Sequence, residues 1–177
     1  MANTYKLDIV VNAYKYLNQR KIIKKYYSEL ICDWISDIDN VNHLFKYDYI
    51  KFSIKELLSI IKEGYNLLNM HLKNIEFKFN VISRMDDMFF GNGFTIIIAL
   101  NDELYVKFED DESVKLEKGD AIYFYNDVRF HVSLSKDNKI VENIRMICID
   151  IDIDTVELVA KLDGWWVYVK DRDKLLI

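Results

Sequence analysis

The segment SRMDDMFFGNG holds the residues whose types and spacing come nearest to a metal site. Asp86 could supply a carboxylate ligand, and a histidine two positions earlier would complete a pair on the same face of a strand. The residue at that position is Arg84. Its guanidinium stays protonated and offers only hydrogen-bond donors, so it cannot bind a metal. The segment is therefore a metal site, a metal site that has lost a ligand, or a charged turn before GNG.

Three residues further along the chain could act together with Asp86. Thr95 opens the apolar run TIIIAL, His131 follows the stretch KGDAIYFYNDVRF, and Arg145 precedes MICIDI. Imidazole is the commonest metal ligand, and an arginine can hold a carboxylate through two parallel hydrogen bonds. Structural roles compete with these chemical ones. His131 could be a hydrogen-bonded histidine on an alternating strand, and Arg145 could form a cross-strand ion pair.

The spacing of apolar residues predicts the elements that would position these side chains. Up to residue 72 the spacing is helical, the run KIIKKYY is expected to be part of a helix, and Ser53 with Glu56 forms a capping box before the clearest helix. After that helix the period changes to two, and about six to eight strands follow. We expect one α+β domain, 1–177, in which a mainly helical part at 1–72 packs on an antiparallel barrel or sandwich at 73–170.

Composition narrows the classes of function. The net charge of −5 argues against binding to nucleic acid through phosphate contacts, and no apolar run reaches the ~20 residues that span a bilayer. The first residues lack the pattern of a signal peptide, so a cytoplasmic protein is expected. Cys32 and Cys148 stand in apolar surroundings and are expected to be buried free thiols.

Three further carboxylates, Asp150, Asp152 and Asp154, alternate with isoleucine in the run IDIDID. Alternation places them on one face of a strand, where they could in principle attract a cation. We expect that face to be solvated. Proline is absent from the chain while Lys, Asn, Ile, Asp and Tyr are abundant, which favours an AT-rich genome, such as that of a virus or of a low-GC microbe.

The order of these motifs resembles that of the Fe(II)/2-oxoglutarate-dependent dioxygenases, and of the prolyl-hydroxylase branch in particular. That family has His-x-Asp at the end of one strand and then a strand of the form T-hydrophobic-LN. A Gly-Asp turn leads to a second histidine, with an arginine or lysine beyond it. Here RMD, TIIIALND, KGDAIYFYNDVRFH and IRMICIDI follow in that order over about residues 75–152. The resemblance implies a double-stranded β-helix, a jelly-roll or cupin-like barrel, on which the helical N-terminal part packs.

The resemblance also assigns roles. Asp86 and His131 would be ligands of Fe(II), and Thr95 and Arg145 would contact 2-oxoglutarate, with Arg145 binding its far carboxylate. A mononuclear iron held by two histidines and one carboxylate leaves three positions for 2-oxoglutarate and oxygen.

Two residues depart from the family pattern. Arg84 stands in place of the first histidine and could form an ion pair with Asp86 where iron would lie. Ala99 occupies a position where related hydroxylases often have a tyrosine that hydrogen-bonds the co-substrate. The sequence thus keeps the motifs expected for the barrel but lacks one metal ligand and one co-substrate contact.

Three functions are compatible with this pattern. The first is a catalytically degenerate domain that binds a protein partner and needs no cofactor; in a virus it would interfere with a host hydroxylase pathway. The second is an active dioxygenase with an incomplete His/Asp/His triad, whose missing ligand comes from water or substrate. The third is a cupin-like binder of a small molecule, although the Pro-x-Gly and the paired histidines of the first cupin motif are missing.

Overall fold

The structure is a computed structural model that describes residues 10–12, 19–35, 48–68, 70, 72–79, 93–125, 129–136, 144–153, 159–162 and 165–170. Its strands and helices, in chain order, are β1 (Val10–Asn12), β2 (Lys21–Ile23), α2 (Glu29–Ile35), α4 (Asp48–Gly64), β3 (Leu72–Phe79), β4 (Gly93–Ala99), β5 (Glu103–Phe108), β6 (Ser113–Glu117), β7 (Ala121–Tyr125), β8 (Phe130–Ser133), β9 (Met146–Ile153), β10 (Val159–Leu162) and β11 (Trp165–Lys170). Neither helix in these residues has the length and apolar character that a membrane span requires.

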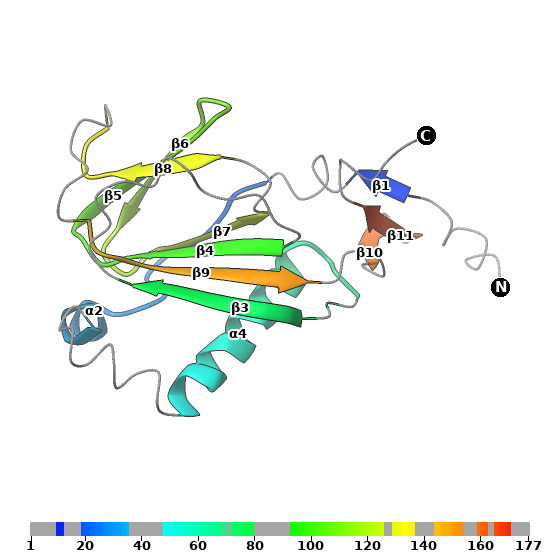
Figure 1. Ribbon diagram of the computed structural model, residues 1–177, viewed down its shortest axis with the longest axis horizontal. Helices are drawn as coiled ribbons and strands as arrows, with labels where there is room; N and C mark the ends of the chain where they lie inside the picture. The colour runs from blue at the N-terminus through cyan, green and yellow to red at the C-terminus, as the bar shows by residue number, and fades with distance from the viewer. Residues whose placement is uncertain are drawn as a thin grey trace.

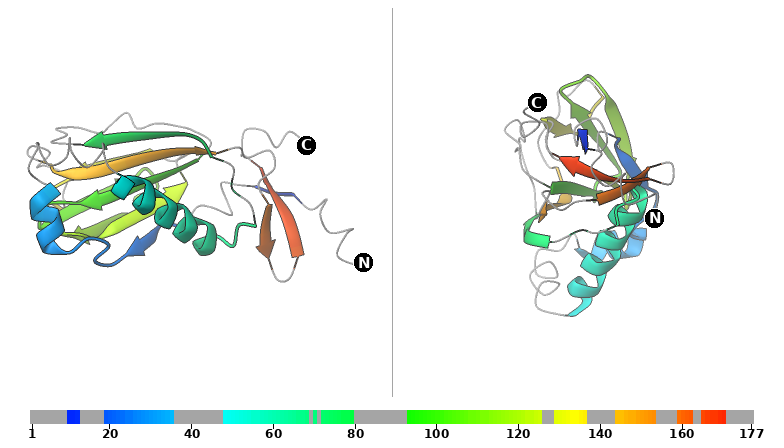
Figure 2. Two further views of the ribbon diagram at one scale, coloured as in Figure 1. Left: turned by 90° about the horizontal axis from the view of Figure 1, so that it is seen from below. Right: turned by 90° about the vertical axis from the view of Figure 1, so that its right-hand side faces the viewer.

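Two sheets face each other, and α4 covers the outer side of the larger one (Figures 1 and 2). The larger sheet has the order β2-β7-β4-β9-β3, and the smaller has the order β6-β5-β8. Within each sheet these strands pair antiparallel: β4 pairs with β7 and β9 in the larger sheet, and β5 pairs with β6 and β8 in the smaller one. This arrangement is a jelly roll, and it confirms the cupin-like β fold expected from the sequence.

Strand β4 is buried along its whole length because both of its faces are covered. On the outer side, Ile96 and Ile98 belong to a core with Leu57 and Ile61 of α4, and all four residues are at most 2% exposed. A strand covered on two faces is built mostly of apolar residues, which explains the sequence FTIIIA, in which Thr95 is the one polar side chain.

A second core fills the space between the two sheets. The rings of Phe108, Phe124 and Phe130 meet there, with centroids 4.9 Å apart for the first two and 5.0 Å for the last two, both pairs edge to face. Such geometry aligns the positive edge of one ring with the negative face of another. The buried members of this interior core are Ile97, Ala99, Leu104, Val106, Phe108, Leu116, Ile122, Phe124, Phe130, Val132, Ile144, Met146 and Cys148.

Strand β1 forms a third sheet with β10 and β11, in the order β1-β11-β10, and this three-stranded sheet lies beside the barrel (Figure 1). β1 runs parallel to β11, and β10 is antiparallel to it. Ala160 and Val169 are fully buried in the core beneath α4. The backbone hydrogen bond from Leu68 N–H to the Val159 carbonyl, 2.7 Å long, joins β10 to the segment after α4.

The helical part predicted at 1–72 is not supported in that form. β1 and β2 are strands, and β2 pairs with residues 121–123 of β7. The run KIIKKYY therefore forms an edge strand and a turn, in which Lys25 has a φ of 52°. Pairing with a sheet edge outweighs local helical spacing, since propensity is a weak prior. α4 is confirmed as a helix, but it begins at Asp48, so Ser53 lies inside it and is not its cap.

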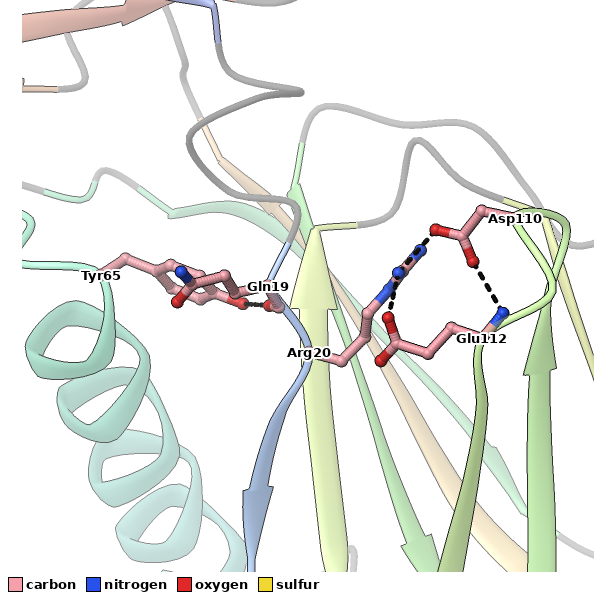
Figure 3. A network of polar contacts seen from close by, with 5 residues as sticks. All are labelled: Gln19, Arg20, Tyr65, Asp110 and Glu112. Atoms are coloured by element: carbon pink, nitrogen blue, oxygen red, sulfur yellow. Dashed lines mark hydrogen bonds and ion pairs between the residues drawn. The ribbon is translucent and has the colours of Figure 1, made fainter.

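Arg20 connects the segment before β2 to the turn between β5 and β6 (Figure 3). Its guanidinium lies 2.7 Å from Asp110 Oδ2, 2.8 Å from Glu112 Oε2 and 4.1 Å from the centre of the Phe108 ring. The Arg20 side chain is only 6% exposed, so these pairs are less screened than pairs at an open surface. Burial raises the pKa of Asp110, but hydrogen bonds from Arg20 and the backbone outweigh it, and the net pKa is lowered.

The turn at Gly119 holds the other end of the same N-terminal segment. The Tyr27 N–H donates to the Gly119 carbonyl at 3.1 Å, and the Gly119 N–H donates to the Ala99 carbonyl at 2.9 Å. Gly119 has a φ of +90°, and a Cβ there would lie 2.1 Å from the Tyr27 carbonyl oxygen. Glycine is therefore required at this position by both the backbone conformation and the space available.

Asp120, the second residue of the Gly-Asp motif, is fully buried and serves the fold. Its carboxylate accepts hydrogen bonds from the Lys25 N–H at 2.9 Å, the Glu117 N–H at 3.0 Å and Lys24 Nζ at 3.0 Å. Burial raises the pKa of Asp120, but these three donors outweigh it, and the net pKa lies below its usual value. The motif thus fastens the N-terminal segment to the barrel.

Replacing Asp120 by asparagine should lower the free energy of unfolding by about 1–3 kcal/mol at neutral pH, because a charged acceptor of three hydrogen bonds is lost. The lowered pKa sets the pH dependence: this stabilisation is complete above the ordinary aspartate value of about 4 and disappears as the pH falls through the lower folded-state value. Urea unfolding of both proteins from neutral to acidic pH measures the difference, which should narrow in acid. A difference that stays constant would contradict this role.

Candidate functional site

The five residues singled out in the sequence do not share one environment. Arg84 and Asp86 lie outside the described residues, so their roles as replaced histidine and metal ligand stay predictions. Thr95, His131 and Arg145 are described, and the fold places each of them at a different part of the barrel.

Thr95 lies inside the barrel and is 1% exposed. Its position on β4 alternates with Ile96 and Ile98 of the helix-side core, so it faces the smaller sheet together with Ile97. Its Oγ1 donates a hydrogen bond of 2.8 Å to Asp150 Oδ1, and the two residues are register partners on β4 and β9. Thr95 therefore supports a buried carboxylate, a role that its place in the TIIIAL run did not indicate.

Asp150 corrects the expectation of a solvated face on the IDIDID run. It is 6% exposed, and its neighbours at alternate positions, Met146 and Cys148, belong to the interior core. Asp152 is half-buried, and Asp154 lies outside the described residues. The prediction was wrong because an alternating pattern shows that two faces differ but does not show whether both are covered. β9 lies between β4 and β3, and both of its faces are buried.

His131 lies on the outer face of the smaller sheet. Its neighbours on β8, Phe130 and Val132, are buried in the interior core, so strand alternation directs His131 away from that core. It is half-buried, and its register partner on β5 is Lys107. The structure therefore does not bring His131 together with Thr95 inside the barrel.

Arg145 lies immediately before β9, five residues ahead of Asp150, which is in the middle of that strand. Its side chain is exposed, while its backbone is held: the Arg145 N–H donates to Asn101 Oδ1 at 2.6 Å, and its carbonyl accepts from the Leu100 N–H at 3.0 Å. At about 3.4 Å per residue, Arg145 and Asp150 are separated by roughly 17 Å along the strand. This separation is too long for one small ligand to contact both Thr95 and Arg145.

The described interior does not fit a site for Fe(II) and 2-oxoglutarate. Such a site requires several oxygen or nitrogen ligands around an open space. The space between the sheets is instead filled mainly by the buried apolar side chains of the interior core, Ala99 among them, and the buried polar residues Thr95 and Asp150 are hydrogen-bonded to each other. Within the described part of the chain no group of three or more His, Cys, Asp or Glu side chains is placed to hold a metal ion.

A surface pocket of about 270 Å³ lies around His131 and is called the outer pocket below. Its lining consists of Lys107, Phe108, Glu109, Asp111, Arg129, Phe130 and His131. Sequence reasoning found the histidine but missed the lysine and the arginine. Only the register between β5 and β8, which is a long-range feature, brings the lysine opposite the histidine. A second pocket of about 350 Å³, between the end of α4 and β10, is lined by Ser59, Lys62, Glu63, Asn66, Leu67, Leu68 and Lys161.

The two cysteines are buried free thiols, as expected. Cys32 packs near the Gly119 turn, and Cys148 belongs to the interior core. Burial raises the pKa of Cys32, which keeps this thiol protonated and unreactive at neutral pH.

The Thr95–Asp150 contact can be tested by substitution. Thr95→Val keeps the shape of the side chain but removes the donor to a buried carboxylate, so we expect it to lower the free energy of unfolding by about 1–3 kcal/mol. Thr95→Ser keeps the hydroxyl and should cost only about 0.8 kcal/mol for the lost methyl group. Chemical denaturation of the three proteins measures both effects. An equal cost for valine and serine would mean that the hydrogen bond adds nothing to stability.

Comparisons with known proteins support the fold alone. No known family matches the sequence, and no curated protein matches it. Among solved structures, a prolyl-4-hydroxylase from Pseudomonas putida is similar with a TM-score of 0.50 and 12% identity, over 76% of this chain and 85% of that chain. A DUF861 family protein from Thermotoga maritima has a TM-score of 0.28 and 17% identity, over 46% of this chain and 77% of its own. The chain thus shares a cupin-like jelly-roll fold with the hydroxylase.

Proposed function

We propose that this protein is a jelly-roll domain of prolyl-hydroxylase-like architecture that acts by binding a protein partner and does not catalyse 2-oxoglutarate-dependent oxidation. The observation that carries the proposal is the apolar filling of the barrel interior, with Phe108, Phe124 and Phe130 at its centre. The fold likeness to a prolyl-4-hydroxylase supports the architecture. Arg84, in place of the first histidine, supports the loss of the metal site.

Energetics favour this proposal over an active oxygenase. A ligand the size of 2-oxoglutarate would have to displace buried rings, and losing one such ring costs about 3–5 kcal/mol. Its charges would also enter an apolar space, where an unpaired buried charge costs several kcal/mol more. An active site would further need His131 to turn inward, which would shift β8 by one residue and expose Phe130 and Val132.

The metal half of the proposal is tested by titrating the purified protein with Mn(II), an oxygen-insensitive substitute for Fe(II), with and without 2-oxoglutarate. We expect no specific site with a dissociation constant below about 100 µM, because the described interior offers no cluster of ligands. Calorimetry and the electron spin resonance signal of free Mn(II) provide the measurement. His131→Ala serves as the control and should behave like the wild type. A stoichiometric micromolar Mn(II) site that is lost in His131→Ala would overturn the proposal, and so would succinate formation when Fe(II), 2-oxoglutarate and oxygen are supplied.

The partner half needs a separate measurement. Protein captured from a lysate of the natural host should include a component that stays in stoichiometric complex through size-exclusion chromatography. Because the proposal gives iron no role, a chelator should leave this complex intact. A complex that forms only with iron, or a partner that leaves hydroxylated, would contradict it.

A further inference from the structure

We propose that residues 19–24 form a strap that detaches from the barrel as a unit while the barrel stays folded, and that its detachment uncovers the edge of β7. The strap contains β2, which pairs with residues 121–123 of β7. It is tethered on both sides, since β1 pairs with β11 in the third sheet, and Tyr27 and Cys32 are buried in the core beneath α4. The opened strap therefore stays close to the edge of β7 and can close again.

Little apolar surface holds the strap in place. Ile22 is 44% exposed, and Ile23 is only partly buried against the core beneath α4. Tyr27 and Cys32, further along the chain, are buried members of that core. Segments with few buried apolar contacts open at a lower free energy than the whole domain. We therefore expect a boundary in stability between Ile23 and Tyr27.

Lys25 lies at this boundary and has the backbone of a hinge. Its φ of 52° falls in the left-handed region, which costs free energy for a residue other than glycine. A change of φ at Lys25 would swing residues 19–24 away from β7 and relieve that cost. The hinge itself stays on the barrel, because the Lys25 N–H donates to Asp120 Oδ1 at 2.9 Å.

The ion pairs at the start of the strap can open without leaving a buried charge. Arg20 pairs with Asp110 and Glu112, whose side chains are 42% and 48% exposed, so water can replace the guanidinium around both carboxylates. Asp110 also keeps a hydrogen bond from the Glu112 N–H, 3.1 Å long. An ion pair is costly to break when one of its charges stays buried and unpaired, and neither carboxylate meets that condition.

Asp120, at the other end of the strap, stays hydrogen-bonded in both positions. The exposed Lys24 side chain reaches this fully buried carboxylate with Nζ at 3.0 Å, and that contact is lost when the strap detaches. The donors from the Lys25 N–H and the Glu117 N–H remain, because neither belongs to the strap. The strap therefore ends at Lys24, and its opening leaves the Gly-Asp turn intact.

Detachment exposes groups that the closed strap covers (Figure 3). The backbone of residues 121–123 loses its β2 partner, and an uncovered strand edge presents unpaired N–H and carbonyl groups. The Phe108 ring loses the Arg20 guanidinium, which lies 4.1 Å from its centre in the closed form. The Tyr65 hydroxyl, which donates to the Gln19 carbonyl, becomes accessible to water. The position of the strap thus decides whether the edge of β7 is available for pairing.

Native-state hydrogen exchange, followed by NMR at urea concentrations below the unfolding transition, measures the opening in the free protein. We expect the amides that join β2 to β7 to exchange at least about 100-fold faster than the amides that join β4 to β9. Their rates should depend little on urea, because a local opening exposes little surface. The Tyr27 amide, beyond the hinge, should follow the slower group.

Two variants separate opening of the strap from unfolding of the barrel. Arg20→Gln should speed exchange of the strap amides by about tenfold, since it removes two ion pairs that only the closed form makes. Thr95→Val should speed exchange between β4 and β9 by about tenfold and leave the strap amides unchanged, because the Thr95–Asp150 contact persists while the strap opens. The control Lys115→Gln removes an exposed ion pair with Glu103 and should leave the strap amides unchanged.

Two results would overturn the strap. One is exchange of the β2–β7 amides at the same rate and with the same urea dependence as the β4–β9 amides, which would mean that β2 leaves only when the barrel unfolds. The other is an equal acceleration of both groups by Thr95→Val. If Arg20→Gln does not fold, Arg20→Lys takes its place; it keeps the charge without the planar fork and should accelerate the strap amides by a smaller factor.

Discussion

Close packing of apolar side chains between the two sheets is the constraint on which the rest of this structure depends. The rings of Phe108, Phe124 and Phe130 come from three strands, and their contacts fix the register of those strands against one another. Because a slip of one residue would expose each ring, the register is strongly specified. That register decides which residues face outward, and it places Lys107 and His131 side by side on the surface. The same packing that closes the interior therefore creates the outer pocket.

The N-terminal segment completes this barrel from outside. Strand β7 would otherwise present an unpaired edge, and β2 covers it with only three residues. So short a strand contributes few backbone hydrogen bonds, and polar contacts at its two ends support it. Arg20 holds one end to Asp110 and Glu112 (Figure 3), and Asp120 holds the other. The segment is thus part of the fold, although nothing in its local sequence suggests a strand.

Sequence reasoning succeeded where local pattern determines structure and failed where distant segments decide. The run FTIIIA and the apolar stripe of α4 predict burial correctly because each apolar pattern is long and regular. β2 was predicted as helix because its apolar spacing is helical and its sheet partner lies about a hundred residues away. Alternation along a strand shows that its two faces differ, but it does not show which elements cover each face. The pattern therefore could not predict that His131 lies on the outer face or that Asp150 lies in the interior. The position of a candidate site on a β scaffold is therefore a question of register.

The motif order that resembles an oxygenase has a structural explanation at several of its positions. Gly119 is required by a φ of +90° and the approach of the Tyr27 carbonyl, and Asp120 by three hydrogen-bond donors. Thr95 supports a buried carboxylate. A fold that crosses repeatedly between two sheets needs turns and strand starts in a fixed order, whatever its chemistry. Residues required for such reasons follow in that order with or without a metal site, so their order is an argument for shared architecture. An argument for catalysis requires side chains that meet around one site. Among the described residues, His131 lies on the outer face of the smaller sheet and Thr95 lies in the interior, so the two do not meet.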